Sequence, residues 1–175
     1  LALAPPAIAQ EAPPPAPPAD DGGLTGSVSD ESEWQDTSIA ITSFATDADV
    51  ATAASAGSTG ALGRAIAEVI SADLRNNGLF KPVGPSGLPQ PSYAQVQAPD
   101  YGTWSARSAE MLVQGYVRAG ANGDLTIGCY LYDVGLKQQL TRAGWVVPAA
   151  DWRRAAHKCA DLVYSRLSGE SPFFD

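Results

Sequence analysis

The fold is decided by residues 111–147, which read MLVQGYVRAGANGDLTIGCYLYDVGLKQQLTRAGWVV. The dipeptide Asn122-Gly123 indicates a tight turn, because both residues tolerate the positive φ that hairpin turns require. Two alternating runs flank this turn, at Met111–Val117 and Leu125–Val134, and they predict the paired strands of a hairpin. A second turn leads into a further run, Leu140–Val147. The stretch therefore predicts three consecutive strands.

Upstream of this stretch, the pattern predicts a strand, a helix and a second strand. Ser38–Phe44 alternates as a strand does, and Leu79–Val83 reads as a short strand. Between them the apolar residues have helical spacing, and Gly78 is a helix stop. Residues 84–99 are rich in proline and predict an irregular loop, followed by a short helix over Tyr101–Ala109. The apolar positions of the main helix, over residues 61–77, are Leu62, Ile66, Val69, Ile70 and Leu74.

Downstream, one more helix is predicted after Pro148 ends the last strand. Asp151 is placed to cap this helix, which runs to Leu167 with an apolar stripe along one side. The fold class is therefore α/β: a mixed sheet of about five strands with two main helices. The two helices can share one face of the sheet or lie on opposite faces, and the sequence leaves both arrangements open.

Charge is distributed unevenly along the 175 residues. The chain has a net charge of −8, and residues 1–36 hold seven acidic residues and no Lys or Arg. The same segment contains seven of the 14 prolines, so we expect residues 10–36 to form a disordered, Pro-rich acidic arm before a folded domain at 37–169. An acidic chain does not attract nucleic acid electrostatically. Since no run approaches the 20 or so apolar residues of a membrane span, no membrane insertion is expected.

The first nine residues resemble the end of a signal peptide. Ala7-Ile8-Ala9 has the small-x-small pattern of a signal peptidase site, and a polar terminus begins at Gln10. Export would place the chain in an oxidising compartment. Cys129 falls on the Ile127/Leu131 side of its strand and Cys159 on the apolar stripe of the last helix. A disulfide and a pair of free core thiols both fit this placement.

No residue pattern indicates a catalytic, metal or cofactor site. His157 is the only histidine, and Asp161, four residues later, is in reach of its ring N–H. We interpret His157 as a packing residue, because no nucleophile motif accompanies it. The stretch Gly57–Arg64 lacks the Gly-Lys-Ser/Thr ending of a phosphate loop and is interpreted as a flexible loop. Tyr130 and Tyr132 with Arg118 are weighed as a binding face, although a basic track is missing.

The end of the chain resembles the TolB family. Residues 152–170 match its pattern W-R-x-x-A-H-x-x-x-D-x-x-Y-x-x-L-T-G-E, with Ser168 in place of the usual Thr. Residues 66–80 match a helix ending in D-L-R-x-S-G-L-F, and Leu131–Val134 resembles a third segment, F-R-L-W-D-V. The residues matched to these motifs, interpreted as structural, are Trp152, Arg153, His157, Asp161, Tyr164, Asp73 and Gly78.

This resemblance implies a periplasmic, non-catalytic subunit of the Tol-Pal envelope system, with roles in outer-membrane integrity and cell division. The family's Pal-binding propeller would follow this domain, and we interpret residues 170–175 as the start of a linker to it. TolA contact is expected at the N-terminal segment, here placed at Leu24-Thr25-Gly26-Ser27-Val28, although this segment matches the family only faintly. The alternatives are a stand-alone periplasmic binding or assembly module without a propeller, and a hydrolase that uses His157.

Overall fold

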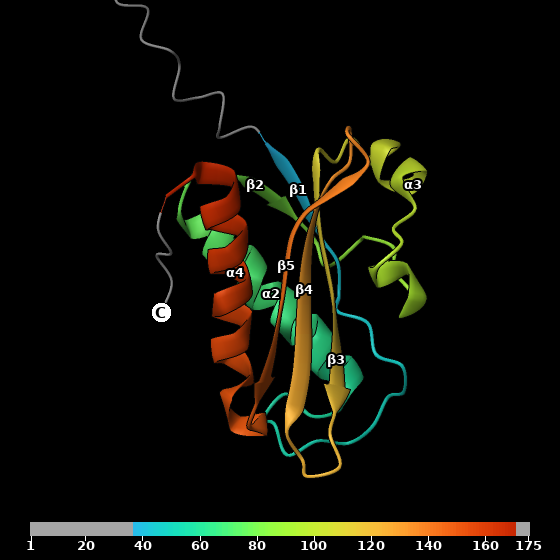
Figure 1. The fold of residues 1–175 in the computed structure, drawn as a ribbon, viewed down its shortest axis with the longest axis vertical. Helices are drawn as coiled ribbons and strands as arrows, with labels where there is room; N and C mark the ends of the chain where they lie inside the picture. Colours follow the sequence, from blue (N-terminus) through green and yellow to red (C-terminus); the bar gives the residue numbers. More distant parts are fainter. Residues whose placement is uncertain (1–36, 171–175) are drawn as a thin grey trace, which may run out of the picture.

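A computed structural model describes residues 37–170, and it shows one five-stranded sheet between two unequal layers (Figure 1). The strands stand in the order β2-β1-β3-β4-β5. The expected leader at 1–9, the arm at 10–36 and its segment Leu24–Val28 lie outside the described residues, as does the linker beyond Glu170. Those expectations stay predictions. The strands are β1 (Ser38–Ile41), β2 (Lys81–Val83), β3 (Met111–Ala119), β4 (Leu125–Asp133) and β5 (Gln138–Val147).

The sheet is mixed, because its two halves are connected differently. β1 pairs in parallel with β2 and with β3. The β1-to-β2 crossover contains helix α2 (Thr59–Asn76), as parallel neighbours require. β3, β4 and β5 are antiparallel neighbours joined by short turns, so the hairpin prediction from residues 111–147 is confirmed. The predicted α/β class, with five strands and two main helices, is also confirmed.

Both main helices cover the same face of the sheet, which settles the arrangement that the sequence left open. Figure 1 shows α4 (Trp152–Ser168) beside the strands and α2 running behind them, and residues of both helices belong to the same core. The inward residues of α2 pack with those of α4 and with alternate residues of the strands, in one apolar cluster. Its members with no exposed surface include Ile39, Ile41, Leu62, Ile66, Ile70, Leu74, Val113, Val117, Ile127 and Leu131.

An irregular segment covers part of the opposite face. It includes the single-turn helices η1 (Ala94–Val96) and α3 (Tyr101–Ser105) and packs on a second, smaller apolar cluster. Strand alternation places Tyr130 and Tyr132 in this cluster, whereas Ile127, Cys129 and Leu131 face the helices, as predicted. The 84–99 loop and a short helix after it were also expected from the sequence.

Several boundaries differ from the predictions. Gly57–Arg64 is not a flexible loop, because α2 begins at Thr59 and includes Gly60, Gly63 and Arg64. β1 ends at Ile41 rather than Phe44, although Ala45 makes a further parallel bridge to Tyr116. Asp151 makes no side-chain capping bond, because the chain enters α4 through the single turn η2 (Ala149–Asp151). In residues 37–170, no helix is long and apolar enough to cross a membrane.

Candidate functional site

The family-motif residues come together along the contact between α2 and α4, which we call the helix seam. His157 on α4 and Asp73 on α2 form its centre, with 2.7 Å between Nδ1 and Oδ2. Both side chains are mostly shielded, at 31% and 15% exposed. Sequence spacing indicated only Asp161 as a residue in reach of His157, whereas packing between α2 and α4 provides Asp73 as its partner. The seam therefore joins two of the three matched segments.

Asp161 is nonetheless part of the buried structure. It lies one helical turn beyond His157 and is only 9% exposed. Burying a carboxylate costs free energy unless other groups compensate its charge. Its position on the sheltered side of α4 supports a structural role for this motif residue.

The other end of the seam is closed by Trp152. Its indole is buried, and Nε1 donates to the hydroxyl of Ser55 at 3.2 Å. The guanidinium of Arg153 lies 4.8 Å from the centre of the indole ring, within range of a cation–π contact. The two motif residues at the start of α4 therefore attach the 45–58 loop to this helix and shield the indole from water.

Tyr164 occupies the far end of α4. Its ring contacts Phe80 edge-on at 6.4 Å, and its hydroxyl donates to the carboxylate of Glu170 at 2.6 Å. This hydrogen bond to Glu170, together with burial, raises the pKa of Tyr164 above its ordinary value. Ser168, which stands where the family usually has Thr, donates its hydroxyl to the Tyr164 carbonyl at 2.8 Å. Since threonine has the same hydroxyl, this bond accounts for the replacement.

Gly78 ends α2 in the way its type predicts. Its φ of +73° lies in the left-handed region, which other residues adopt at a cost. Next to it, the Asn77 side chain accepts from the Leu79 amide at 3.0 Å and turns the chain toward β2. Gly169 plays the same part at the end of α4, with φ of +74°. These motif positions are explained by chain geometry alone.

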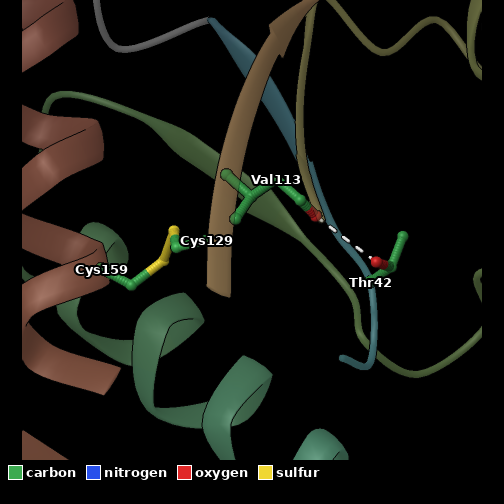
Figure 2. Close-up of a disulfide and its surroundings, with 4 residues drawn as sticks. All are labelled: Thr42, Val113, Cys129 and Cys159. Atoms are coloured by element: carbon green, nitrogen blue, oxygen red, sulfur yellow. Dashed lines mark hydrogen bonds between the residues drawn. A yellow bond between two sulfur atoms is a disulfide. The ribbon is translucent and has the colours of Figure 1, made fainter. Parts of the chain in front are cut away.

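Cys129 and Cys159 connect the helix layer to the sheet. Figure 2 shows the disulfide running from β4 to α4, with Cα atoms 5.9 Å apart. Both residues are fully buried, so the bridge lies inside the main core. On the opposite side of the sheet in the same view, the Thr42 hydroxyl donates to the Val113 carbonyl at 3.4 Å. The bridge therefore joins two elements that are otherwise held by apolar contact.

The hydrogen-bonded turn before α2 was not predicted from the sequence. The Asp49 carboxylate accepts from the Gly60 amide at 2.8 Å, and the Thr59 hydroxyl donates to the Ala48 carbonyl at 2.9 Å. The bond from Gly60, with others from Ser58 and Thr59, lowers the pKa of Asp49. Ser58 adds the N-cap bond to Ala61. Ser58-Thr59 before an apolar periodic run is the one signal that could have indicated this helix start.

The aromatic binding face weighed from the sequence is wrong for two of its three residues. Tyr130 and Tyr132 are buried at 7% and 2% exposed, and the Tyr132 hydroxyl donates to the Val96 carbonyl at 2.6 Å. The irregular segment covers them, so they belong to a core. Arg118 is exposed and pairs with Asp47 at 3.1 Å.

The seam offers hydrogen bonds and apolar contacts but no catalytic arrangement. In the described part of the chain, no three His, Cys, Asp or Glu side chains gather as a metal site needs. The pocket beside α3 is lined by Pro89, Gln90, Pro91, Gln95, Asp100, Thr103, Trp104 and Gln114. The Asp100 carboxylate there accepts from the Gly102 and Thr103 amides, so it caps α3. The seam residues connect secondary structure elements through the contacts described above.

Fold and seam together define a small α/β domain whose two helices cover one face of a mixed sheet. Residues 30–140 match the family model described as the TolB amino-terminal domain. Since this covers more than half of the sequence, the chain belongs to the TolB amino-terminal domain family.

Curated relatives agree with this assignment. The chain is 71% identical over its whole length to Tol-Pal system protein TolB 1 of Novosphingobium aromaticivorans, and it spans 38% of that protein. It is 54% identical to the TolB of Sphingopyxis alaskensis, with 97% of this chain and 37% of the relative covered. The chain therefore spans less than two fifths of the length of these relatives.

A solved structure has the same fold. The crystal structure of TolB from Acinetobacter baumannii aligns with a TM-score of 0.58 and 25% identity, over 78% of this chain and 29% of that one. The resemblance stated from the three motif segments is thus confirmed.

Proposed function

We propose that this domain is a non-catalytic interaction module of a TolB protein in the periplasm, and that its N-terminal segment contacts TolA. Membership of the TolB amino-terminal domain family is the observation that carries the proposal. The seam supports it further, because its motif residues are engaged in contacts within the domain: His157 with Asp73, Trp152 with Ser55 and Tyr164 with Glu170. A rigid domain with an acidic, Pro-rich segment ahead of β1 suits a protein that binds through an extended peptide.

Within the envelope, the complete protein would contribute to outer-membrane integrity and to constriction during cell division. Pal would bind mainly through the propeller, so this chain alone is expected to bind TolA and to bind Pal weakly. The relatives' printed name, Tol-Pal system protein TolB, supports membership of that system. No nucleic acid, membrane insertion or cofactor is part of the proposal.

A pull-down against the C-terminal domain of TolA tests the role of the arm. The full chain should capture TolA, and deletion of residues 10–36 should abolish capture. A matched variant with Leu24→Ser and Val28→Ser separates the expected contact segment from the rest of the arm, and Pro13→Ala with Pro17→Ala serves as its control. Capture that survives the deletion would contradict the proposal.

We further propose that Cys129 and Cys159 are bonded in the cell, because export exposes the pair to an oxidising compartment. Their burial and Cα separation of 5.9 Å support the bridge. Protein purified without reductant, unfolded and titrated for thiols should contain none. Two free thiols would contradict the bridge and favour the alternative of unpaired core cysteines.

A further inference from the structure

The two edges of the sheet differ in how well they are protected. β2, at one edge, has three residues, and its Pro82 has no backbone N–H to offer. β5, at the other edge, has ten residues and no proline. Natural proteins usually block a long edge strand, because its outward backbone groups can pair with another chain. The β5 edge is therefore the place in this fold where another strand could be added.

The outward backbone of β5 is unoccupied over most of its length. Within residues 37–170, one bond reaches it from outside the β4 ladder, from Arg166 Nε to the Leu140 carbonyl at 3.3 Å. The irregularity in the β4–β5 pairing lies between Leu131 and Tyr132, near the start of β5. Thr141–Val147 is consequently a regular segment with its outer hydrogen-bonding groups available.

On the sheet face opposite the two main helices, the side chains of this segment form an exposed surface of uneven height. Arg142, Gly144 and Val146 alternate along it, opposite Tyr130, Gly128 and Thr126 of β4. Val146 is 70% exposed, which is unusual for a large apolar side chain. A Cβ on Gly144 would meet only the Ile127 carbonyl oxygen, at 3.8 Å, so space remains above this glycine. The surface therefore offers an apolar contact, a gap and a positive charge, each two residues apart.

Charge around β5 favours an acidic partner. Residues 136–168 contain six Lys or Arg and two Asp, whereas residues 37–135 contain five and eight acidic residues. Of these basic residues, Arg142 lies on β5 and Lys137 directly precedes the strand. Arg166 reaches the edge as well, because its Nε donates to the Leu140 carbonyl. A second copy of the chain would bring two such basic surfaces together, which like-charge repulsion opposes.

We propose that the β5 edge binds an extended, acidic segment of a partner protein as a sixth, antiparallel strand. Side chains directly opposite one another lie on the same face of an antiparallel pair. The partner should therefore place an apolar residue opposite Val146, a large residue over Gly144 and an acidic residue opposite Arg142. Read along the partner, this is the pattern apolar-x-large-x-acidic.

The test uses amide NMR on the full chain with the blocked peptide Thr-Val-Thr-Tyr-Thr-Glu-Thr as probe. Peptide binding should shift the amide signals of Thr141–Val147 and leave those of β2 unchanged. A matched peptide with Lys in place of Glu should bind about fivefold more weakly, as expected for one exposed charge pair. Arg142→Glu should reverse this preference. Methylation of alternate peptide nitrogens should abolish binding, because it removes the backbone donors.

Each other outcome overturns the proposal. No shift at millimolar peptide, shifts outside β5, or equal binding of both peptides would show that the edge does not select an acidic strand. The outward amides of Thr141–Val147, which do not bond to β4, would assign the edge to the chain's own arm if they were already protected from exchange in the free, dilute chain. Protection that grows with protein concentration would assign it to a second copy.

Discussion

The two faces of the sheet are covered by different means. On one face, two long helices pack on an apolar cluster, and a disulfide and the His157–Asp73 pair connect that layer. On the other, an irregular segment with two single-turn helices packs on a smaller apolar cluster that includes Tyr130 and Tyr132. Regular helices bury continuous apolar stripes, whereas the irregular cover depends on individual bonds such as Tyr132 to Val96. The helix face should therefore carry most of the free energy of folding.

The largest expected effect comes from truncating the helix-face core. Ile127 is fully buried in the main cluster, so Ile127→Ala should lower the free energy of unfolding by about 2–5 kcal/mol. Val96, a buried residue of the irregular segment, provides the test on the other face. Urea unfolding would measure both. If Val96→Ala lowered the free energy of unfolding as much as Ile127→Ala or more, the helix face would not carry most of the stability.

Removal of the bridge should come next. The double variant Cys129→Ala and Cys159→Ala opens a link between residues 30 apart in sequence, and such a loop is worth about 3 kcal/mol. Thermal unfolding of oxidised wild type and the double variant measures this difference. Reduced wild type is the control, and it should unfold close to the variant. No change on reduction would show that the helix layer is held by packing alone.

A smaller effect is expected on the second face. Tyr132→Phe removes the bond to the Val96 carbonyl and should cost about 1 kcal/mol. Burial, and to a smaller extent Tyr101, raises the pKa of Tyr132 above 10.0. The folded state thus holds this proton more tightly than the unfolded one, and stability falls as pH rises above about 10. Urea unfolding from pH 8 to 11 would measure how the free energy of unfolding falls with pH, and this fall should be less steep in the variant. An equally steep fall would contradict this assignment.

The smallest effect concerns the turn before α2. Hydrogen bonds from Gly60, Ser58 and Thr59 lower the pKa of Asp49, so its charged form stabilises the fold above pH 4 and this stability is lost in acid. Asp49→Asn should lower the urea midpoint slightly at pH 7, and the difference should shrink as the pH falls below 3.8 and the carboxylate is protonated. Asp151→Asn serves as the control, because Asp151 is exposed and makes no side-chain capping bond. If the variant stayed less stable than wild type in acid, the asparagine side chain would disturb the turn by something other than the lost carboxylate charge.

Patterns local in sequence predicted much of this fold. The Asn122-Gly123 turn and the alternation of Leu125–Val134 gave the hairpin and the inward side of Cys129. What the sequence did not indicate depends on contacts between distant segments. Asp73 is 84 residues from His157, so helical spacing, which indicated Asp161, could not indicate this pair. Likewise, alternation placed Tyr130 and Tyr132 on one face but carried no information that the 84–105 segment covers it.

We propose that the arm, residues 10–36, contacts TolA and that the folded domain at 37–169 serves as a stable support for the arm. Calorimetric titration of the TolA C-terminal domain into three full-length chains tests it: wild type, the Leu24→Ser and Val28→Ser variant, and the double cysteine variant. The account predicts that the arm substitutions abolish binding heat and that the cysteine variant binds within about twofold of wild type, since its core remains folded. Unchanged affinity after the arm substitutions, with loss in the cysteine variant, would place the contact on the folded domain and contradict the account.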